Sequence, residues 1–376
     1  MASSCDAIVV GAGPAGLAAA TALKARGLDA VILEKTSAVG AVWRRHYDRL
    51  HLHTDRARSG LPGLPMPKAY GRYPSRAQVI EYLEAYAAKF ALKPVFNATV
   101  SAIRRDGSLW RAEAGVETRV APIVVVATGL ADFPYSPSWP GMQDFVGPIF
   151  HSSLYRNPAP FAAKRVLIVG YGNSGAEIAL DLSEANVEVA LAVRSPVNVI
   201  PRELFGRPIL AWGLAGRLFP ARVVDRINAP LLRCAIGSID KLGLKRSPKG
   251  PLQSIEEDGR VPVIDIGTLE AIRDGRIKLR GDVSSFSRDS VVFKQSPVER
   301  FDAVILATGF RPDLRLLLPD AKGVLSDAGA PLVSGASTVE PGLFFCGAVP
   351  SALGQLRQIG IDATRIASAA QSLRTA

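Results

Sequence analysis

The sequence of 376 residues predicts an α/β protein made of two similar units, one inserted into the other. Three observations point to this class. An apolar run, a glycine loop and a helix-like stretch follow one another twice, at residues 7–26 and 166–182. Two more apolar runs, 123–126 and 303–306, each lead into Ala-Thr-Gly, and a last one at 343–346 precedes a helix-like stretch. Short apolar runs that alternate with helices are typical of parallel sheets.

Composition indicates an ordered globular protein of the cytoplasm. Hydrophobic residues make up 48% of the chain, and no apolar run approaches the roughly 20 residues of a transmembrane helix. Cys5, Cys234 and Cys346 are far apart and form no CxxC pair, which argues against a disulfide framework and for a reducing compartment. The N-terminal stretch shows no signal-peptide pattern, so we expect a cytoplasmic protein.

The formal charge of +11 comes from 45 Lys and Arg residues against 34 Asp and Glu residues. Such a surplus is common in proteins that bind nucleic acid or anionic membranes. No zinc finger, RNA-binding signature or stripe of aromatic and basic residues is present, so we expect no nucleic-acid partner. Cations between residues 201 and 250 alternate with apolar residues, which predicts amphipathic surface helices or, alternatively, a surface for a membrane or partner. They include Arg202, Arg207, Arg217, Arg222, Arg226, Arg233, Lys245, Arg246 and Lys249.

The first glycine loop has the spacing of a dinucleotide-binding turn. A buried-type strand leads into Gly11, Gly13 and Gly16, which would allow a tight turn, close approach of a phosphate and packing of the next helix. The N-terminus of that helix, at residues 14–16, would supply amide donors and the helix dipole to a pyrophosphate. A second strand ends at Glu34, about 20 residues after the first glycine, where a carboxylate accepts hydrogen bonds from ribose hydroxyls.

The second loop repeats this spacing at Gly170, Gly172 and Gly175, but its following strand ends at a base, Arg194. A guanidinium can bind a 2′-phosphate with paired hydrogen bonds, whereas a carboxylate would repel it. Ser195 can add a hydroxyl. The first site is therefore predicted to take FAD or NAD and the second NADP(H), with an exposed and unliganded Arg194 as the alternative.

Together the two loops predict two Rossmann-like dinucleotide-binding domains. Two dinucleotides side by side suggest hydride transfer from NADPH to a flavin, and FAD in the first site follows by analogy with flavoproteins. The C-terminal strand and helix would complete the first sheet, so the NADP domain is predicted as an insertion into the FAD domain. The predicted boundaries are 1–157 and 291–376 for the FAD domain and 158–290 for the NADPH domain, with a helical insertion near 201–250.

Residues 145–155 match FxGxxxHxxxY and lie between GAGPAG and GYGNSG, an order that resembles the flavin-containing monooxygenases. Further stretches, among them YDRLHLH (47–53), LPGLPMP (61–67) and VRSPVNVIPRE (193–203), are similar to the YUCCA-type enzymes, which convert indole-3-pyruvate to the auxin indole-3-acetate. The likeness covers residues 6 to about 312. The short chain and its divergent C-terminal stretch indicate a bacterial relative.

This resemblance implies an FAD- and NADPH-dependent monooxygenase that acts through a C4a-(hydro)peroxyflavin. Its substrate would be an aromatic 2-oxo acid such as indole-3-pyruvate, together with O2. The alternatives are an N- or S-oxygenating monooxygenase of small nucleophiles, an NADPH-dependent flavin oxidoreductase, and a redox-sensing binding protein. The hard chemistry of such enzymes belongs to the cofactor, which agrees with the lack of a Ser/His/Asp triad or a carboxylate pair.

The motifs and the resemblance nominate a set of cofactor-binding residues. Val42 and Trp43 match the hydrophobic-Trp pair that lies beside the flavin in the family. His53 and Thr54 stand where many members have an Asn near the flavin, and no other residue is nominated for catalysis. No metal site is expected. The cofactor-binding residues are Gly11, Gly13, Pro14, Ala15, Gly16, Glu34, Lys35, Val42, Trp43, His53, Thr54, Val100, Thr128, Gly129, Gly347, Gly170, Gly172, Asn173, Ser174, Gly175, Arg194, Ser195, Thr308 and Gly309.

A few polar and aromatic residues allow two interpretations each. Asn173 is interpreted as shaping its loop and His151 as a structural hydrogen-bonding histidine, ahead of catalytic roles. The aromatic residues Trp139, Trp212 and Phe219 are expected in the core, with an aromatic substrate pocket as the alternative. A substrate carboxylate would pair with an arginine such as Arg202 or Arg207.

Overall fold

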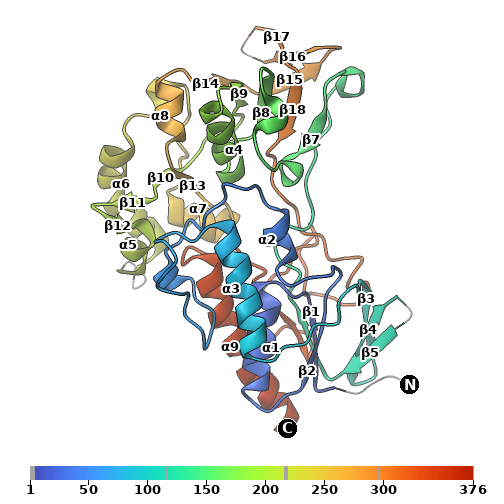
Figure 1. Ribbon diagram of the computed structural model, residues 1–376. Helices are drawn as coiled ribbons and strands as arrows, with labels where there is room; N and C mark the ends of the chain where they lie inside the picture. Colours follow the sequence, from blue (N-terminus) through green and yellow to red (C-terminus); the bar gives the residue numbers. More distant parts are fainter. Residues whose placement is uncertain (1–4, 116, 216–218, 295–296, 376) are drawn as a thin grey trace. The chain divides into compact units, whose positions relative to one another are not determined.

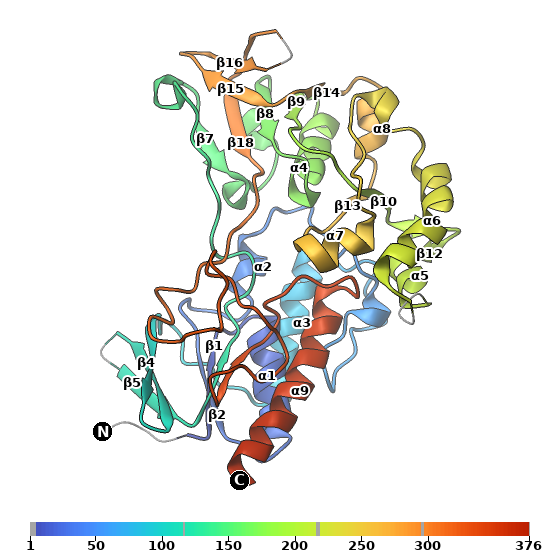
Figure 2. The ribbon, with the colours of Figure 1, turned by 180° about the vertical axis from the view of Figure 1, so that it is seen from behind.

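The computed structural model describes residues 5–115, 117–215, 219–294 and 297–375. The chain forms two compact units, and the second is inserted into the first along the sequence. The first unit consists of the described residues of Met1–Arg45, Thr54–Phe133 and Phe310–Ala376, and the second of His46–His53 and Pro134–Gly309. Figures 1 and 2 show the ribbon from opposite sides. The predicted α/β class and the insertion are confirmed.

The first unit is built around a parallel sheet with the strand order β19-β6-β1-β2. All residues of β1 and β6 are buried, because layers cover both faces of these strands. Helices α1, α3 and α9 lie side by side in both views (Figures 1 and 2), and α1 packs against α9. These elements are β1 (Ala7–Val10), α1 (Pro14–Lys24), β2 (Ala30–Leu33), α3 (Arg76–Lys89), β6 (Ile123–Val126), β19 (Leu343–Phe345) and α9 (Gln355–Thr375).

A three-stranded antiparallel sheet, which we did not predict, forms the other layer of the first unit. Ile103 and Trp110 from this sheet share a buried cluster with Ile8 and Val124 of the parallel sheet. The Trp110 indole N–H donates to the carbonyl oxygen of Pro341 at 2.9 Å, so its one polar atom is satisfied. The strands are β3 (Val100–Asp106), β4 (Leu109–Ala114) and β5 (Glu117–Ala121).

The second unit repeats the plan of the first. Its parallel sheet has the order β14-β9-β8-β18-β7, α4 and α8 pack along it, and the antiparallel strands β15, β16 and β17 cover its other face. Phe286 and Phe293 of that small sheet share a cluster with Leu167 and Val304 of the parallel sheet. The bounds are β7 (Ile149–His151), β8 (Arg165–Val169), α4 (Asn173–Glu184), β9 (Glu188–Ala192), α8 (Thr268–Arg273), β14 (Ile277–Arg280), β15 (Val283–Phe286), β16 (Ser290–Phe293), β17 (Glu299–Arg300) and β18 (Ala303–Leu306).

The division between the units differs from the predicted boundaries at 157/158 and 290/291. The structure divides the chain at 133/134 and 309/310, and it assigns residues 46–53 to the second unit. The reason is the strand pairing in the second sheet. β18 pairs with β8 on one side and with β7 on the other, so β7 and β18 belong to the second unit. The C-terminal strand β19 pairs with β6 and completes the first sheet as predicted.

The stretch 201–250 contains the predicted surface helices, α5 (Ile209–Ala215) and α6 (Ala221–Ile236), while Arg217 lies outside the described residues. Four short strands and two helices complete the described elements that position the site. They are α2 (Ala41–Arg45), β10 (Val199–Pro201), β11 (Glu203–Leu204), β12 (Arg207–Pro208), α7 (Pro251–Asp258) and β13 (Val263–Asp265). Among the helices so described, none is long and apolar enough to cross a membrane.

Candidate functional site

The first glycine loop joins β1 to α1, and its glycines have different reasons to lack a side chain. Gly11 has φ +107°, and a Cβ on it would lie 2.7 Å from the carbonyl oxygen of Ala127. A Cβ on Gly16 would lie 1.8 Å from the oxygen of Gly11, so packing alone requires glycine there. Gly13 has extended backbone and no atom within 4 Å of such a Cβ. Packing does not explain Gly13, whereas close approach of a ligand phosphate does.

Glu34 lies at the edge of this loop in a fixed orientation. Its carboxylate is buried and accepts the backbone N–H of Ala12 at 2.7 Å. The other carboxylate oxygen accepts the N–H and the hydroxyl of Thr36, at 2.9 and 2.8 Å. Because three donors hold it beside the glycine loop, this carboxylate has the place that a ribose ligand requires. The next residue, Lys35, forms an ion pair with Asp132.

The other residues nominated in the first unit are only partly brought together. Thr128 lies against the loop, since its Cα is 3.7 Å from a Cβ built on Gly11, and Gly129 follows with φ +80°. Gly347 also lies there, because a Cβ on it would be 3.2 Å from the Cβ of Ala15 at the start of α1. Val100 instead begins β3 and packs on the hydrophobic cluster beneath that sheet.

Three more nominated residues of the first unit lie outside the glycine loop. Val42 and Trp43 lie on the short helix α2 and are partly buried. The Thr54 hydroxyl is hydrogen-bonded to the hydroxyl of Ser59 at 2.6 Å.

The second glycine loop, between β8 and α4, has the same construction. Gly170 has φ +109°, and a Cβ on it would lie 2.4 Å from the oxygen of Ala307. A Cβ on Gly175 would lie 2.1 Å from the oxygen of Gly170, while one on Gly172 meets no atom within 4 Å. The open glycine therefore recurs at the middle position of both loops. This repetition is the geometry expected of two sites for a pyrophosphate.

Arg194 follows β9 as Glu34 follows β2, at the strand next to the glycine-loop strand. Its side chain is exposed and has no hydrogen-bond or ion-pair partner within the described part of the chain. Ser195 beside it is partly buried. A guanidinium without an internal partner is available to a ligand phosphate.

Asn173 has both ends of its amide occupied inside the protein. Its Nδ2 donates to the carbonyl oxygen of Pro262 at 3.1 Å, and its Oδ1 accepts the N–H of Ile264 at 2.8 Å. These bonds fasten the start of α4 to β13. This is the loop-shaping arrangement that the sequence led us to expect.

A buried polar network lies directly behind this loop, and sequence reasoning missed it. Glu177, on the first turns of α4, is 2% exposed and is bonded to Nε2 of His53. The Tyr47 hydroxyl is hydrogen-bonded to Glu177 and to Ser174 of the loop, and burial together with the Glu177 charge raises the pKa of Tyr47 well above its ordinary value. Tyr47 therefore remains a protonated donor. His53, nominated as a flavin neighbour, is thus held in the second unit by a carboxylate.

The segment 46–53 is held on α4 at several further points. Arg49 forms ion pairs with Asp181 at 3.4 Å and Glu184 at 2.8 Å. The Tyr155 hydroxyl donates to Asp181 at 2.7 Å, and burial raises the pKa of Tyr155. Four residues of α4, counting Ser174, thus anchor a segment that lies more than 100 positions earlier in the sequence.

His151 has the structural role that was predicted for it. It is buried, and its Nδ1 accepts the backbone N–H of Ser153 at 3.1 Å. Its Nε2 therefore carries the proton and donates to the carbonyl oxygen of Gly309 at 2.9 Å. Burial lowers the pKa of His151, which favours this neutral form. Nearby, the Thr308 hydroxyl donates to the oxygen of Tyr135, so the Ala-Thr-Gly turn after β18 is fixed from two sides.

The three aromatic candidates are not gathered into a pocket. Trp139 packs against Phe286 in the core cluster of the second unit. Trp212 and Phe219 are exposed, at 39% and 61%. Of the two arginines nominated for a substrate carboxylate, Arg202 has other interactions and Arg207 is exposed.

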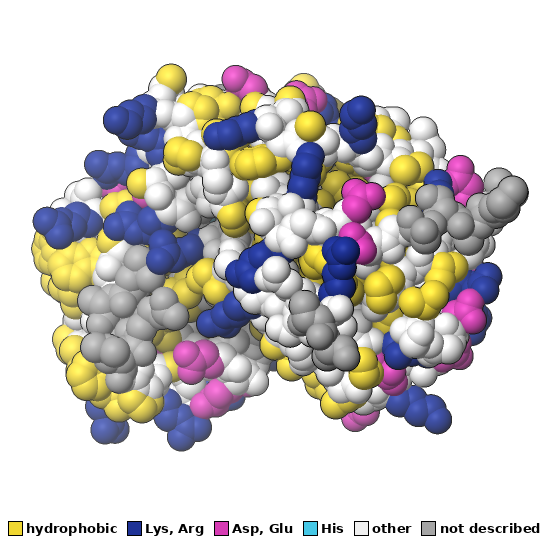
Figure 3. Space-filling view, turned by 90° about the horizontal axis from the view of Figure 1, so that it is seen from below, with side chains coloured by type: hydrophobic (Ala, Val, Ile, Leu, Met, Phe, Trp, Pro, Cys, Tyr) yellow, Lys and Arg dark blue, Asp and Glu magenta, His cyan; other side chains and the backbone are white. Residues whose placement is uncertain are grey.

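The described residues contain no cluster of His, Cys, Asp and Glu that could hold a metal ion. All three cysteines are free, and Cys346 is buried with a raised pKa because of that burial. No dithiol is present to exchange with a disulfide substrate. On the face shown in Figure 3, Lys and Arg side chains are interspersed with hydrophobic and acidic side chains.

Comparisons with known proteins agree with this geometry. Residues 8–201 match the pyridine nucleotide-disulphide oxidoreductase family. The chain is 42% identical over 330 residues to indole-3-pyruvate monooxygenase YUCCA1 of Oryza sativa, covering 86% of this chain and 81% of that protein. It is 40% identical over 337 residues to indole-3-pyruvate monooxygenase YUCCA6 of Arabidopsis thaliana, covering 86% and 80%.

Among solved structures, a flavin-containing monooxygenase from Stenotrophomonas maltophilia is similar over 98% of this chain and 99% of its own, with a TM-score of 0.73 and 26% identity. The similarity therefore extends through both units.

Proposed function

Because this chain belongs to the flavin-containing monooxygenase family, in the group of the indole-3-pyruvate monooxygenases, we propose that it oxidises a 2-oxo acid of the indole-3-pyruvate type. The chain is an NADPH-dependent flavin monooxygenase, and its cofactors are FAD and NADP(H). The proposed reaction is oxidative decarboxylation. One oxygen atom of O2 enters the new carboxylic acid, the other leaves as water with two electrons from NADPH, and CO2 is released.

The two cofactors are assigned from one difference between two otherwise matching units: the residue after the second strand is an acid in one and a base in the other. Glu34 and Arg194 follow equivalent strands, and the middle glycine of each loop is open to a ligand. The fixed carboxylate of Glu34 suits the unphosphorylated ribose of FAD. The free guanidinium of Arg194 suits the 2′-phosphate of NADPH.

In this proposal the first unit holds FAD through the loop residues Gly11, Gly13 and Gly16, with Glu34 on the ribose. Thr128 and Gly347 border the same loop. The second unit holds NADPH through Gly170, Gly172, Ser174 and Gly175, with Arg194 and Ser195 on the 2′-phosphate. Asn173 keeps the loop in shape, and Thr308 and Gly309 close the turn beside it. Lys35, Val42, Trp43, Thr54 and Val100 remain proposed contacts, argued from the family resemblance.

FAD, once reduced, supplies the activation of O2, and the chain supplies binding, orientation and exclusion of water. The Tyr47 hydroxyl and the His53 imidazole both point their polar atoms at Glu177, directly behind the loop that we assign to NADPH. This network orients Ser174 for a phosphate oxygen. It also fixes the orientation of the His53 ring, because Nε2 is bonded to the Glu177 carboxylate.

The direct test of the substrate is turnover of indole-3-pyruvate by the purified FAD-bound chain with NADPH and O2. We expect indole-3-acetate and CO2 in equal amounts, coupled to NADPH oxidation. An enzyme that oxidises NADPH at the same rate with and without the 2-oxo acid, and forms no indole-3-acetate, would remove the proposed substrate class. Amines and sulfides are the next candidates, since N- and S-oxygenation use the same cofactors.

Reduction of a disulfide is the second candidate, because the matched family includes such enzymes by name. The cysteines disfavour it. Cys346 is buried and unpaired, and neither of the other two forms a CxxC pair. NADPH-dependent reduction of a disulfide dye at a rate above that of 2-oxo acid turnover would favour this candidate instead.

A further inference from the structure

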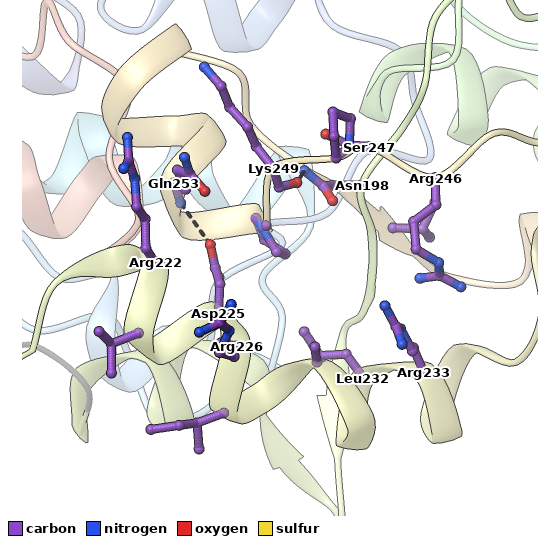
Figure 4. Close-up of a pocket in the computed structure, with 17 residues that line it drawn as sticks. Asn198, Arg222, Asp225, Arg226, Leu232, Arg233, Arg246, Ser247, Lys249 and Gln253 are labelled. Carbon is purple, nitrogen blue, oxygen red and sulfur yellow. Dashed lines mark hydrogen bonds between the residues drawn. The ribbon is translucent and has the colours of Figure 1, made fainter.

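A groove on the second unit, away from the elements that form its glycine loop, has the character of a binding site. It lies between α6 and the segment 246–253 and encloses about 660 Å3, a volume within the range of small-molecule sites. Figure 4 shows the side chains that line it. Five of them are basic and one is acidic, so the groove carries a surplus of positive charge.

The single acid in the groove is already used by the protein. Asp225 is buried, and its two oxygens accept the backbone N–H groups of Leu252 and Gln253 at 3.1 and 2.9 Å. It therefore caps the N-terminus of α7, as the dashed line in Figure 4 indicates for Gln253. Both Asp225 oxygens are thus occupied by backbone donors, and no ion pair joins them to an arginine among the described residues.

Two of the five basic side chains are also neutralised within the protein. Arg222 pairs with Glu257 at 2.8 Å, and Lys249 pairs with Asp258 at 2.6 Å. Arg226, Arg233 and Arg246 form no ion pair with any described residue. Three arginines thus line one groove without an ion-pair partner among the described residues.

Two of these groups meet at one end of the groove. Arg233 lies in the last turn of α6, and Arg246 donates to the carbonyl oxygen of Gly237, the residue that ends the same helix, at 3.3 Å. Figure 4 shows their guanidinium groups turned toward the same space. The helix C-terminus favours cations and is the structural explanation for their position. It does not explain why a cavity lies in front of them.

The walls of the groove are apolar. Val223 and Ile227 on α6 are 43% and 68% exposed, and Leu232, Pro248 and Pro251 continue the lining. None of the described residues that line the groove is aromatic, so none of them would stack on a nucleotide base. A large apolar groove that ends in unpaired guanidinium groups fits an anion with an apolar body, and inorganic phosphate would leave most of the volume unused.

We propose that this groove binds a small organic carboxylate with an apolar body, whose carboxylate lies between Arg233 and Arg246. The lining residues do not include the glycine loop of the second unit, and the inference does not depend on the proposed reaction. Carboxylates of this class include the proposed substrate and its product, so the test uses a probe that the enzyme does not turn over. The groove does begin near the NADPH site, because Val197 and Arg246 are neighbours in a parallel bridge. Competition with NADP+ must therefore be measured.

The test is calorimetric titration of the FAD-bound chain with 3-phenylpropionate, without NADPH and at low ionic strength. We expect one site per chain, with inorganic phosphate and neutral 3-phenylpropanol each binding at least about tenfold more weakly. The variant R233Q/R246Q should weaken the probe about tenfold or more, because it removes the charge-assisted hydrogen bonds. Arg222→Gln is the matched control on the same helix face, and it should change the affinity less than about twofold since Arg222 is already paired.

A second variant keeps the test decisive if R233Q/R246Q fails to fold. Ile227→Glu places a carboxylate on an exposed wall position, where folding tolerates it and a bound carboxylate is repelled. Unchanged affinity in both R233Q/R246Q and Ile227→Glu would overturn the proposal. So would phosphate that binds as tightly as the probe, or loss of the probe when NADP+ saturates the protein, because the groove would then be a generic anion site or part of the nucleotide site.

Discussion

At the scale of single residues, each loop contains one glycine that protein packing requires and one that only a bound ligand explains. Gly175→Ala should lower the free energy of unfolding by several kcal/mol, because its Cβ would overlap the carbonyl oxygen of Gly170. Gly172→Ala should fold normally, since its backbone is extended and the added methyl meets no protein atom. It should nevertheless weaken NADP+ about tenfold or more. Denaturant unfolding and nucleotide titration of the two variants check this, and normal NADP+ affinity in Gly172→Ala would contradict the phosphate site.

Arg194 is predicted to set the preference for NADPH over NADH. In Arg194→Ala the KM for NADPH should rise about 10- to 100-fold, because a charge-assisted pair with the 2′-phosphate is lost. The KM for NADH should change little. Steady-state NADPH and NADH oxidation measure this, with Arg276→Ala as an exposed control in the same unit. Equal effects on the two cofactors would remove the assignment of Arg194.

Glu177 is predicted to hold the polar network behind the NADPH loop. Glu177→Ala should lower the free energy of unfolding by about 2–4 kcal/mol, because Tyr47 and His53 would lose their buried acceptor. Glu184→Ala, near the exposed end of the same helix, should cost less than about 1 kcal/mol. Thermal or urea unfolding compares the two. A similar small loss in both would mean that the network carries no stability.

At this scale the sequence predicted the residues whose role is local. The three glycines and the charged residue after the following strand all lie within one βαβ unit, so spacing alone identifies them. The contact of His53 with Glu177 joins positions 124 apart, which no spacing rule reaches. One signal was available: Glu177 interrupts the apolar side of a helix that must pack on a sheet.

At the scale of elements, strands and helices that alternate with glycine loops were predicted well, because buried parallel strands are continuous apolar runs. The two antiparallel layers, β3–β5 and β15–β17, were missed. Their strands are half-buried and carry charged residues such as Arg104 and Glu113, so they are not the continuous apolar runs on which the prediction relied.

Asp362 is the residue by which α9 holds the C-terminal turns. It is fully buried, and it accepts hydrogen bonds from the Ser334 hydroxyl at 2.6 Å, the Gly347 N–H at 3.2 Å and the Gln358 amide at 2.8 Å. Asp362→Ala should lower the free energy of unfolding by about 2–4 kcal/mol and reduce FAD content, since Gly347 borders the first glycine loop. Asp320→Ala on the surface of the same unit is the control. Full FAD content with unchanged stability would contradict this role of α9.

At the scale of the whole chain, both units are three-layered, and each places a glycine loop at the end of a central parallel strand. The predicted boundaries differ from the observed division by about 20 residues, because β7 and β18 pair with each other and β18 pairs with β8, which the sequence does not reveal. The family was predictable because its motifs lie in the loops of both units. The substrate was not, because the sequence motifs describe cofactor sites.

The measurement that tests the central claim most directly is rapid mixing of the NADPH-reduced, FAD-bound chain with oxygenated buffer, followed through the flavin absorbance. A monooxygenase of this family should show a transient species that differs from both reduced and oxidised flavin, that persists while NADP+ is bound, and that decays faster when indole-3-pyruvate is added. Direct return to oxidised flavin with stoichiometric hydrogen peroxide, at a rate independent of the 2-oxo acid, would contradict the account.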